Sequence, residues 1–236
     1  MIPFIIPPDD KSMAFPNVEL AFDEPNGLLA VGGDLSKDRL LSAYKCGIFP
    51  WYSKHQPILW WSPNPRLVLT PSEIHISRSL HKVLKKNIFK ITYDTAFEQV
   101  ILGCAKPREK EKDTWITQSM FDAYVDLHRA GYAHSFEAWQ DNKLVGGLYG
   151  VAIGQVFFGE SMFSLVSNAS KVTFKYTVDA LISWGFQLID CQVETNYLMD
   201  FGARNIDRRD FIKRLENLTS LQTESFAWQQ SIDHEH

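Results

Sequence analysis

YAHSFEAWQDNKLVGGLYGVAIGQVFFGESMFS, residues 132 to 164, contains three runs rich in aromatic and β-branched residues. The short turn sequences QDNK (140–143) and IGQ (153–155) separate these runs. Such runs joined by tight turns are typical of β-hairpins. We therefore predict an antiparallel meander of three neighbouring strands.

A helix and a further strand follow the meander. Apolar residues recur at helical spacing from residue 170 to 184, Gly185 ends the pattern, and FQLIDCQV (186–193) has the composition of a buried strand. Because a crossover helix returns the chain parallel to the strand that it left, the sheet should be mixed and mostly antiparallel. The predicted class is α/β (α+β), with helices flanking the sheet. Further strands are expected at 66–70 and 89–93, and further helices at 77–87 and 117–131.

The first 65 residues differ in composition from the rest. They are rich in Pro, Gly and Trp, and carry one clear helix signal, with Ser36 before it and Gly47 after it. Four prolines between residues 50 and 65 prevent long regular elements there. We predict a small N-terminal domain over 1–65 and a larger catalytic domain over 66–236.

Composition excludes several classes of protein. The net charge of −4 argues against binding nucleic acid over the whole surface, although a local basic patch is still allowed. Cys46, Cys104 and Cys191 are odd in number and far apart, which fits neither a disulfide framework nor a metal site and indicates a reducing compartment. The seven histidines lack metal-binding spacing, so no metal is expected. Without a signal peptide or an apolar run of ~20 residues, we expect a cytoplasmic protein with no membrane segment.

Three polar side chains in the two strands joined by the helix are candidates for chemistry. Asp190 and Gln192 share one face of their strand, and Glu160 is expected to share a face of its own strand with Phe158 and Met162. If the strands are neighbours, two carboxylates and an amide border an apolar hollow. Because an unpaired buried carboxylate is costly, these groups either satisfy one another in a structural network or form a catalytic site.

A basic run stands out in an acidic chain. Residues 66 to 90 hold six Lys or Arg and one acid, Glu73. The run is either a solvated helix face or a contact for a phosphate backbone. We take Arg78, Lys82, Lys85 and Lys86 as the candidate residues for such a contact with a nucleic acid.

The order of meander, helix and strand resembles the core of GNAT-type acyltransferases. Those enzymes hold acyl-CoA on a glycine-rich loop before the helix, whereas this chain has SLVSNASKV (164–172), without glycines. The resemblance therefore implies a GNAT-like domain with a different acyl donor. An N-acetyltransferase using acyl-CoA through an unusual loop is one alternative, and a non-catalytic tRNA- or peptide-binding module is another.

Nine motifs are similar to those of the leucyl/phenylalanyl-tRNA–protein transferase family. They are EPNGLLAVGGDLS, GIFPW, ILWWSPNPR, HISRS, TWIT, LVGGLYG, GESMFS, NASK and LIDCQV. The resemblance implies transfer of Leu or Phe, and less efficiently Met, from aminoacyl-tRNA to proteins with N-terminal Arg or Lys, which marks them for degradation by the N-end rule pathway. We expect a monomer, and because the donor ester is already activated, we expect no cofactor.

The resemblance also implies roles for particular residues. Glu160, Asp190 and Gln192 form the reacting centre, and Trp51 and Trp115 stack on the terminal adenosine. The pocket for the aminoacyl side chain is assigned to Leu148, Phe157, Met162, Phe174, Leu181 and Ile189. An aminoacyl ester is already activated, so positioning can suffice. Our hypothesis is that Asp190 polarises Gln192 through a hydrogen bond, that Gln192 orients or deprotonates the attacking α-amine, and that Glu160 holds the amine or the terminal ribose. Either carboxylate could instead attract the cationic side chain of the acceptor.

Overall fold

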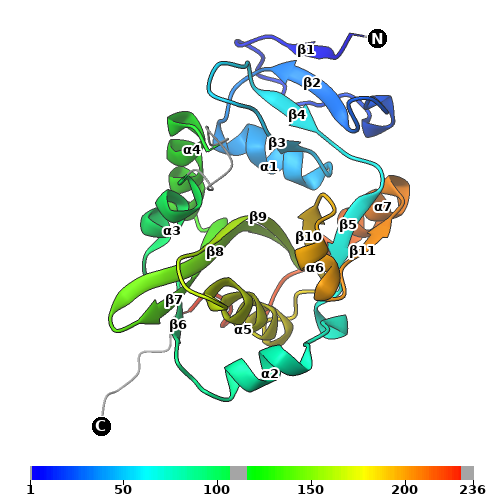
Figure 1. Ribbon diagram of the computed structural model, residues 1–236. Helices are drawn as coiled ribbons and strands as arrows, with labels where there is room; N and C mark the ends of the chain where they lie inside the picture. Colours follow the sequence, from blue (N-terminus) through cyan, green and yellow to red (C-terminus); the bar gives the residue numbers. More distant parts are fainter. Residues whose placement is uncertain (1, 107–115, 230–236) are drawn as a thin grey trace.

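The chain folds around two β-sheets in the computed structural model, which describes residues 2–106 and 116–229 (Figure 1). In chain order the elements are β1 (Phe4–Ile6), η1 (Val18–Leu20), β2 (Leu28–Gly32), α1 (Lys37–Lys45), β3 (Phe49–Pro50), β4 (Leu59–Trp61), β5 (Arg66–Leu69), η2 (Pro71–Glu73), α2 (Arg78–Leu84), β6 (Lys90–Tyr93), α3 (Phe97–Cys104), α4 (Gln118–Arg129), β7 (Ala133–Gln140), β8 (Lys143–Ile153), β9 (Val156–Ser164), α5 (Ala169–Ser183), β10 (Leu188–Gln192), α6 (Asn196–Asp200), β11 (Arg204–Ile206) and α7 (Arg208–Leu218). The predicted α/β class is confirmed.

The larger sheet has the strand order β11-β5-β10-β9-β8-β7-β6. The predicted meander is present as β7, β8 and β9, paired antiparallel. Helix α5 crosses over and delivers β10 parallel to β9, whereas the other strand pairs of this sheet are antiparallel. The expected mixed, mostly antiparallel sheet is therefore confirmed.

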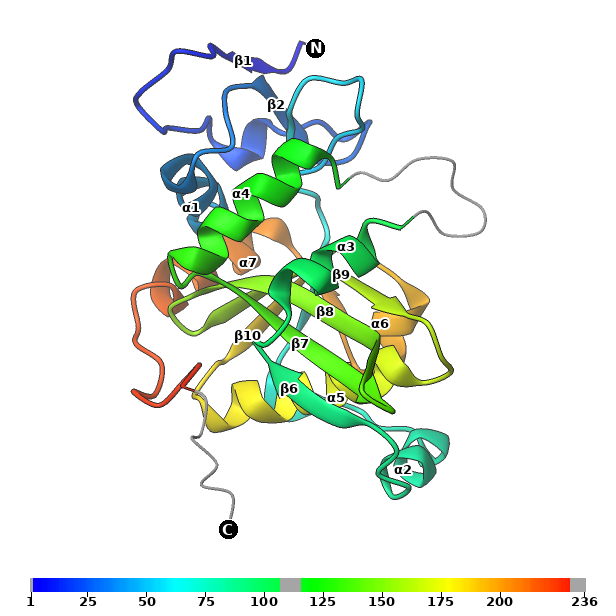
Figure 2. The same cartoon turned by 90° about the vertical axis from the view of Figure 1, so that its left-hand side faces the viewer.

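The two faces of the larger sheet carry different layers (Figures 1 and 2). Helices α5 and α2 lie on one side, which we call the α5 face. Helices α3 and α4 and the N-terminal elements lie on the other side, which we call the N-terminal face. Each face covers its own cluster of buried apolar residues. Any functional group on β9 or β10 therefore belongs to one layer or the other.

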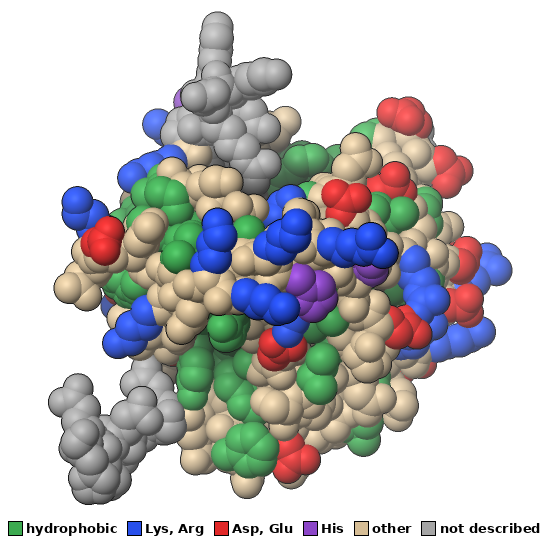
Figure 3. All heavy atoms as spheres, turned by 60° about the horizontal axis from the view of Figure 1, so that its bottom comes forward, with side chains coloured by type: hydrophobic (Ala, Val, Ile, Leu, Met, Phe, Trp, Pro, Cys, Tyr) green, Lys and Arg blue, Asp and Glu red, His purple; other side chains and the backbone are tan. Residues whose placement is uncertain are grey.

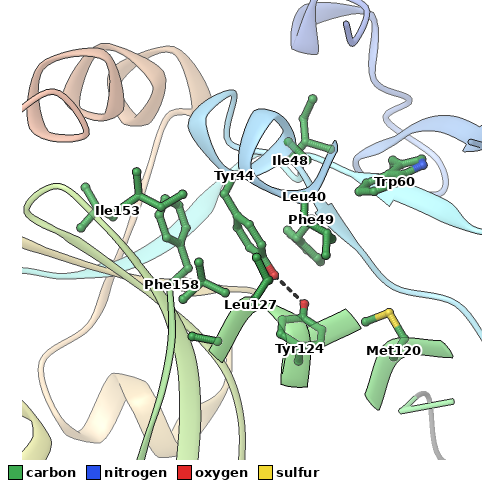
Figure 4. Close-up of a cluster of buried hydrophobic side chains, with 14 of the residues drawn as sticks. Leu40, Tyr44, Ile48, Phe49, Trp60, Met120, Tyr124, Leu127, Ile153 and Phe158 are labelled. Carbon is green, nitrogen blue, oxygen red and sulfur yellow. Dashed lines mark hydrogen bonds between the residues drawn. The ribbon is translucent and has the colours of Figure 1, made fainter. Parts of the chain in front are cut away.

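The smaller sheet has the order β1-β2-β4-β3 and lies above the N-terminal face with helix α1. Gly47 ends α1 with φ of 72°, and a Cβ at this position would lie 2.6 Å from Ile212 of α7. The change of sheet falls between Trp61 and Arg66. One apolar cluster nevertheless joins both sheets, because it includes Trp60 of β4 and Phe158 of β9 (Figure 4). The domain boundary at residue 65 stays a prediction.

A β-bulge in β9 puts Glu160 and Met162 on opposite faces of the sheet. Tyr149 of β8 lies opposite Ser161 and Gly150 lies opposite Gly159, so Glu160 is an extra residue without a partner in β8. An extra residue reverses the alternation of side chains beyond it. Glu160 lies on the N-terminal face together with Phe158, as predicted, whereas Met162, beyond the bulge, packs against the cluster on the α5 face. The prediction that Glu160 and Met162 share a face was therefore wrong.

Candidate active site

Asp190 in β10 is fully buried and paired with Arg66 of β5. The guanidinium donates to both carboxylate oxygens, over 2.8 Å from Nε and 2.6 Å from Nη2. It also donates to the Gly47 carbonyl over 3.2 Å and lies 4.8 and 4.6 Å from the ring centroids of Phe49 and Phe211. Such a bidentate, stacked pair is geometrically fixed. Because its charge is neutralised in this way, Asp190 is not available to attract an acceptor cation.

Gln192 ends β10 in a left-handed conformation, with φ of 63°. Its backbone N–H donates to Asp190 Oδ1 over 2.9 Å, and its side-chain Nε2 donates to Glu160 Oε1 over 2.9 Å. The predicted bond between Asp190 and Gln192 thus exists, but it uses the backbone amide and not the side chain. A left-handed residue of this type costs about 1 to 3 kcal/mol and persists only where neighbours hold it. Asp190 therefore sets the direction of the Gln192 side chain.

Glu160 lies between two tyrosines from the N-terminal face. Tyr44 of α1 donates to Oε1 over 2.7 Å, and Tyr124 of α4 donates to Oε2 over 2.8 Å. The two tyrosine oxygens lie 2.5 Å from each other, as the dashed line in Figure 4 shows. Each tyrosine hydroxyl has one hydrogen, so only two hydrogens are available for three close oxygen–oxygen contacts, which are Tyr44–Tyr124, Tyr44–Glu160 and Tyr124–Glu160. Protonation of Glu160 supplies the third hydrogen and completes the ring of hydrogen bonds.

The electrostatics of Glu160 agree with this proton count. The pKa of its carboxyl group is raised from 4.5 to about 7, and burial is the largest cause. The hydrogen bonds from Tyr44, Tyr124 and Gln192 act in the opposite direction, and the Asp190 charge acts in the same direction as burial. Burial, followed by the Glu160 charge, raises the pKa of both tyrosines well above the ordinary value of 10.0. The cluster can therefore take up and release a proton near neutral pH.

The sequence analysis did not identify Tyr44 or Tyr124 as site residues. Both are fully buried, Tyr44 beside Leu40 and Ala43 on α1, and Tyr124 on the apolar stripe of α4. A buried tyrosine hydroxyl normally has a hydrogen-bond partner, so a tyrosine in each stripe was the signal that pointed to a polar group between the helices.

Strands β9 and β10 stop pairing and diverge beside Glu160 and Gln192, and we call this point the parting. Their pairing covers only Val156–Phe158 and Leu188–Asp190, after which β9 continues to Ser164 and β10 ends at Gln192. A Cβ on Gly159 would have Asp190 O, at 3.5 Å, as its one neighbour within 4 Å. Gly159, Glu160 and Gln192 therefore lie where the two strands no longer pair.

The six predicted pocket residues lie together on the α5 face. They belong to one apolar cluster, in which Met162 is half-buried and the other five are buried: Leu148, Phe157, Phe174, Leu181 and Ile189. Leu148 and Met162 face each other across β8 and β9, and Phe157 pairs with Ile189 across β9 and β10. The apolar and polar sets thus lie on opposite faces and approach each other at the parting.

The remaining predicted contact residues that the structure describes lie on the surface. Trp51 follows β3, is 48% exposed and packs at 5.7 Å against Trp61, whereas Trp115 lies outside the described residues. The four basic residues of the α2 region are all exposed: Arg78, Lys82, Lys85 and Lys86. Figure 3 shows Lys and Arg side chains gathered across this side of the molecule. Arg66, which the sequence places in the same basic run, is buried and does not contribute to this patch.

Two other kinds of feature are absent from residues 2–106 and 116–229. No helix within these ranges is long and apolar enough to cross a membrane. The same ranges hold no group of three or more His, Cys, Asp or Glu side chains that could bind a metal ion.

The point where β9 and β10 stop pairing, with a polar cluster on one face of the mixed sheet and an apolar cluster on the other, is the candidate active site. Residues 68–216 match the family described as leucyl/phenylalanyl-tRNA protein transferase, and residues 33–64 match the N-terminal domain of the same family. The chain belongs to this family, and it is a transferase.

Relatives of the same name cover most of the chain. The leucyl/phenylalanyl-tRNA–protein transferase of Pseudomonas syringae pv. tomato is 59% identical over 201 residues, covering 85% of this chain and 88% of the relative. That of Cellvibrio japonicus is 54% identical over 219 residues, covering 93% and 92%. Among solved structures, an aminoglycoside acetyltransferase from an uncultured soil metagenomic sample matches with a TM-score of 0.39 and 21% identity, covering 50% of this chain and 86% of that one.

Proposed function

We propose that this enzyme transfers Leu or Phe, and less efficiently Met, from aminoacyl-tRNA to the N-terminal Arg or Lys of acceptor proteins. The observation that carries the proposal is the parting of β9 and β10, with Gln192 and Glu160 on one side and an apolar cluster on the other. The aminoacyl side chain enters the parting toward the α5 face, and the ester carbonyl stays beside Gln192.

The apolar cluster suits more than one donor side chain. It is built from Leu, Ile, Met and Phe residues, which adapt to flexible apolar groups. One methylene changes binding in such a pocket by only about 1 to 3 kcal/mol. Discrimination among Leu, Phe and Met is therefore graded, whereas polar and charged side chains are excluded by the cost of desolvation.

Proton transfer in the proposed reaction is assigned to Glu160. The acceptor α-amine, with an ordinary pKa of about 7.7 to 8.0, attacks the ester carbonyl in its neutral form. A carbon–nitrogen bond forms, the bond from the carbonyl carbon to the ribose oxygen breaks, and one amine proton must reach that leaving oxygen. Glu160, with a pKa of about 7 and contact to Gln192, is placed to take this proton and return it. Gln192 orients the amine, and Asp190 acts as a positioning residue held by Arg66.

Surface features support binding of the tRNA. Trp51 is exposed beside Trp61 and can stack on the terminal adenosine, with Trp115 as the second predicted platform. The basic residues Arg78, Lys82 and Lys85, with Lys86 beside them, are placed to contact phosphates of the acceptor stem. A patch of this size fits a short duplex end.

The cellular role follows from this reaction. We propose a monomeric, cytoplasmic enzyme whose product, a protein that begins with Leu or Phe, is a degradation signal of the N-end rule pathway. The partners are therefore aminoacyl-tRNA and proteins with N-terminal Arg or Lys.

A transfer assay tests the proposal. The enzyme is mixed with radiolabelled Phe-tRNA or Leu-tRNA and with peptides that differ only in their first residue, which is Arg, Lys or Ser, or an acetylated Arg as the control. We expect label on the Arg and Lys peptides only, together with release of deacylated tRNA. Binding of tRNA without release would indicate the non-catalytic module, and transfer from acetyl-CoA to the same peptides would indicate the N-acetyltransferase.

A further inference from the structure

Trp228, near the end of the described chain, packs behind one of the predicted pocket residues. Its ring lies 6.3 Å from the ring of Phe157, with 28° between the planes. On its other side the ring stacks on His134, at 3.6 Å and 8°. Trp228 also contacts Phe136, Trp184 and Phe186, at centroid distances of 5.9, 4.5 and 6.0 Å. It therefore fills an aromatic cluster on the α5 face.

The segment that carries Trp228 is tied to the sheet by hydrogen bonds. The Gln155 side chain donates to the Gln222 carbonyl over 2.8 Å, and the Glu224 N–H donates to the Trp184 carbonyl over 3.0 Å. The Tyr93 hydroxyl donates to the carbonyl of Gln229. Figures 1 and 2 show this segment, in red, returning to the sheet near α5 after α7.

The backbone of Trp228 is in a costly conformation. Its φ is 61°, which is rare for a bulky residue. Such a conformation is unfavourable by itself and persists where the surroundings fix it. The contacts of the indole ring are what hold it here, so the position of this ring is well defined.

Phe157 is confined on its opposite side as well. A Cβ on Gly150 of β8 would lie 2.6 Å from the Phe157 ring, so the ring already fills the space above this glycine. With Gly150 on one side and Trp228 on the other, the Phe157 ring cannot recede from the predicted pocket. The depth available to a donor side chain is therefore limited at this point.

We propose that Trp228 sets the depth of the aminoacyl side-chain pocket by holding the ring of Phe157, and so fixes the preference between Leu and Phe donors. This inference rests on the proposed function. Trp228 is a positioning residue in this account, since it acts through Phe157. Removing the indole lets Phe157 move back and deepens the pocket, which favours the longer and bulkier phenylalanyl group.

The test compares Trp228→Leu and Trp228→Phe with the wild-type enzyme. Trp139→Leu is the matched control, because Trp139 is also half-buried but lies on β7 with its Nε1 bonded to Thr92. The measured quantity is the ratio of kcat/KM for Phe-tRNA to that for Leu-tRNA, which does not change when part of the enzyme is merely unfolded.

We expect the ratio to rise about tenfold in Trp228→Leu, which is the low end of the effect of one methylene in a pocket, and to rise less in Trp228→Phe. Trp139→Leu should keep the wild-type ratio. If Trp228→Leu fails to fold, the ratio measured for Trp228→Phe tests the proposal in its place. Ratios within about twofold of wild type in the folded Trp228 variants would overturn this inference alone, whereas a wild-type enzyme that transfers neither amino acid would overturn the proposed function as well.

Discussion

Replacing Glu160 with glutamine should change how the stability of the protein depends on pH. In the folded state the carboxyl group is enclosed with Tyr44 and Tyr124, and burial raises its pKa to about 7. In the unfolded state the pKa returns to about 4.5. Between these values the folded protein binds the proton more strongly than the unfolded chain does. The stability that Glu160 contributes is therefore fully present below the unfolded pKa and is lost as pH rises through the folded pKa.

The size of this effect follows from the two pKa values. One pKa unit corresponds to about 1.4 kcal/mol, so a rise from 4.5 to about 7 corresponds to roughly 3 kcal/mol in the free energy of unfolding. Most of this change, about 2 to 3 kcal/mol, falls between pH 5 and pH 8. Glutamine cannot ionise, so Glu160→Gln does not lose this stability.

Urea unfolding at pH 5, 6, 7 and 8 measures the effect for both proteins. We expect Glu160→Gln to gain about 2 to 3 kcal/mol relative to wild type from pH 5 to pH 8. Glu216→Gln, a change at an exposed position of α7, should show a flat difference over the same range. A flat difference for Glu160→Gln as well would refute the reasoning, because Glu160 would then titrate in the same way in the folded and unfolded states.

Three further predictions concern the groups around Glu160 and the basic helix. Arg66→Met should destabilise the protein by about 3 to 5 kcal/mol in urea unfolding, because it leaves Asp190 buried without its partner, and the double variant with Asp190→Leu should recover most of that loss but not transfer activity. Gln192→Gly should be more stable than Gln192→Ala by about 1 kcal/mol, the reverse of the usual order within a strand, because φ is 63° there. Lys82→Ala and Lys85→Ala should each lower the slope of log affinity for tRNA against log salt by about 0.7 to 0.9 in filter-binding assays, and an unchanged slope would exclude a phosphate contact.

The sheet and its crossover could be predicted because their signals are local. Turn sequences such as QDNK separate the strands of the meander, and Gly185 marks the end of α5. The parallel placement of β10 beside β9 then follows from the handedness and reach of a crossover helix. These rules need no knowledge of distant contacts.

The bulge at Glu160 could not be predicted in the same way. Strict alternation in residues 157–164 predicts a regular strand, and nothing in these residues indicates which one lacks a pairing partner in the neighbouring strand. The register between β8 and β9 is set by packing on both faces of the sheet, so the bulge depends on contacts with α1 and α4. The error about Met162 arose from this one extra residue.

The Arg66–Asp190 pair could not be predicted from the sequence either. Arg66 belongs to a basic run in the sequence, and charge counting treats its members alike. The structure instead places it between Phe49 and Phe211, which are 17 residues before it and 145 residues after it in the chain. Only the folded core shows that this cation neutralises Asp190, and that its role differs from that of the exposed Lys82.

Transfer of label in a single turnover by Gln192→Ala tests the central claim most directly, which is that the reaction takes place where β9 and β10 part. The assay uses radiolabelled Phe-tRNA and a peptide that begins with Arg, with enzyme in excess. We predict a maximal rate at least about 100-fold below wild type, with affinity for Phe-tRNA within about threefold of wild type. A folded Gln192→Ala enzyme that transfers phenylalanine at the wild-type rate would contradict the account.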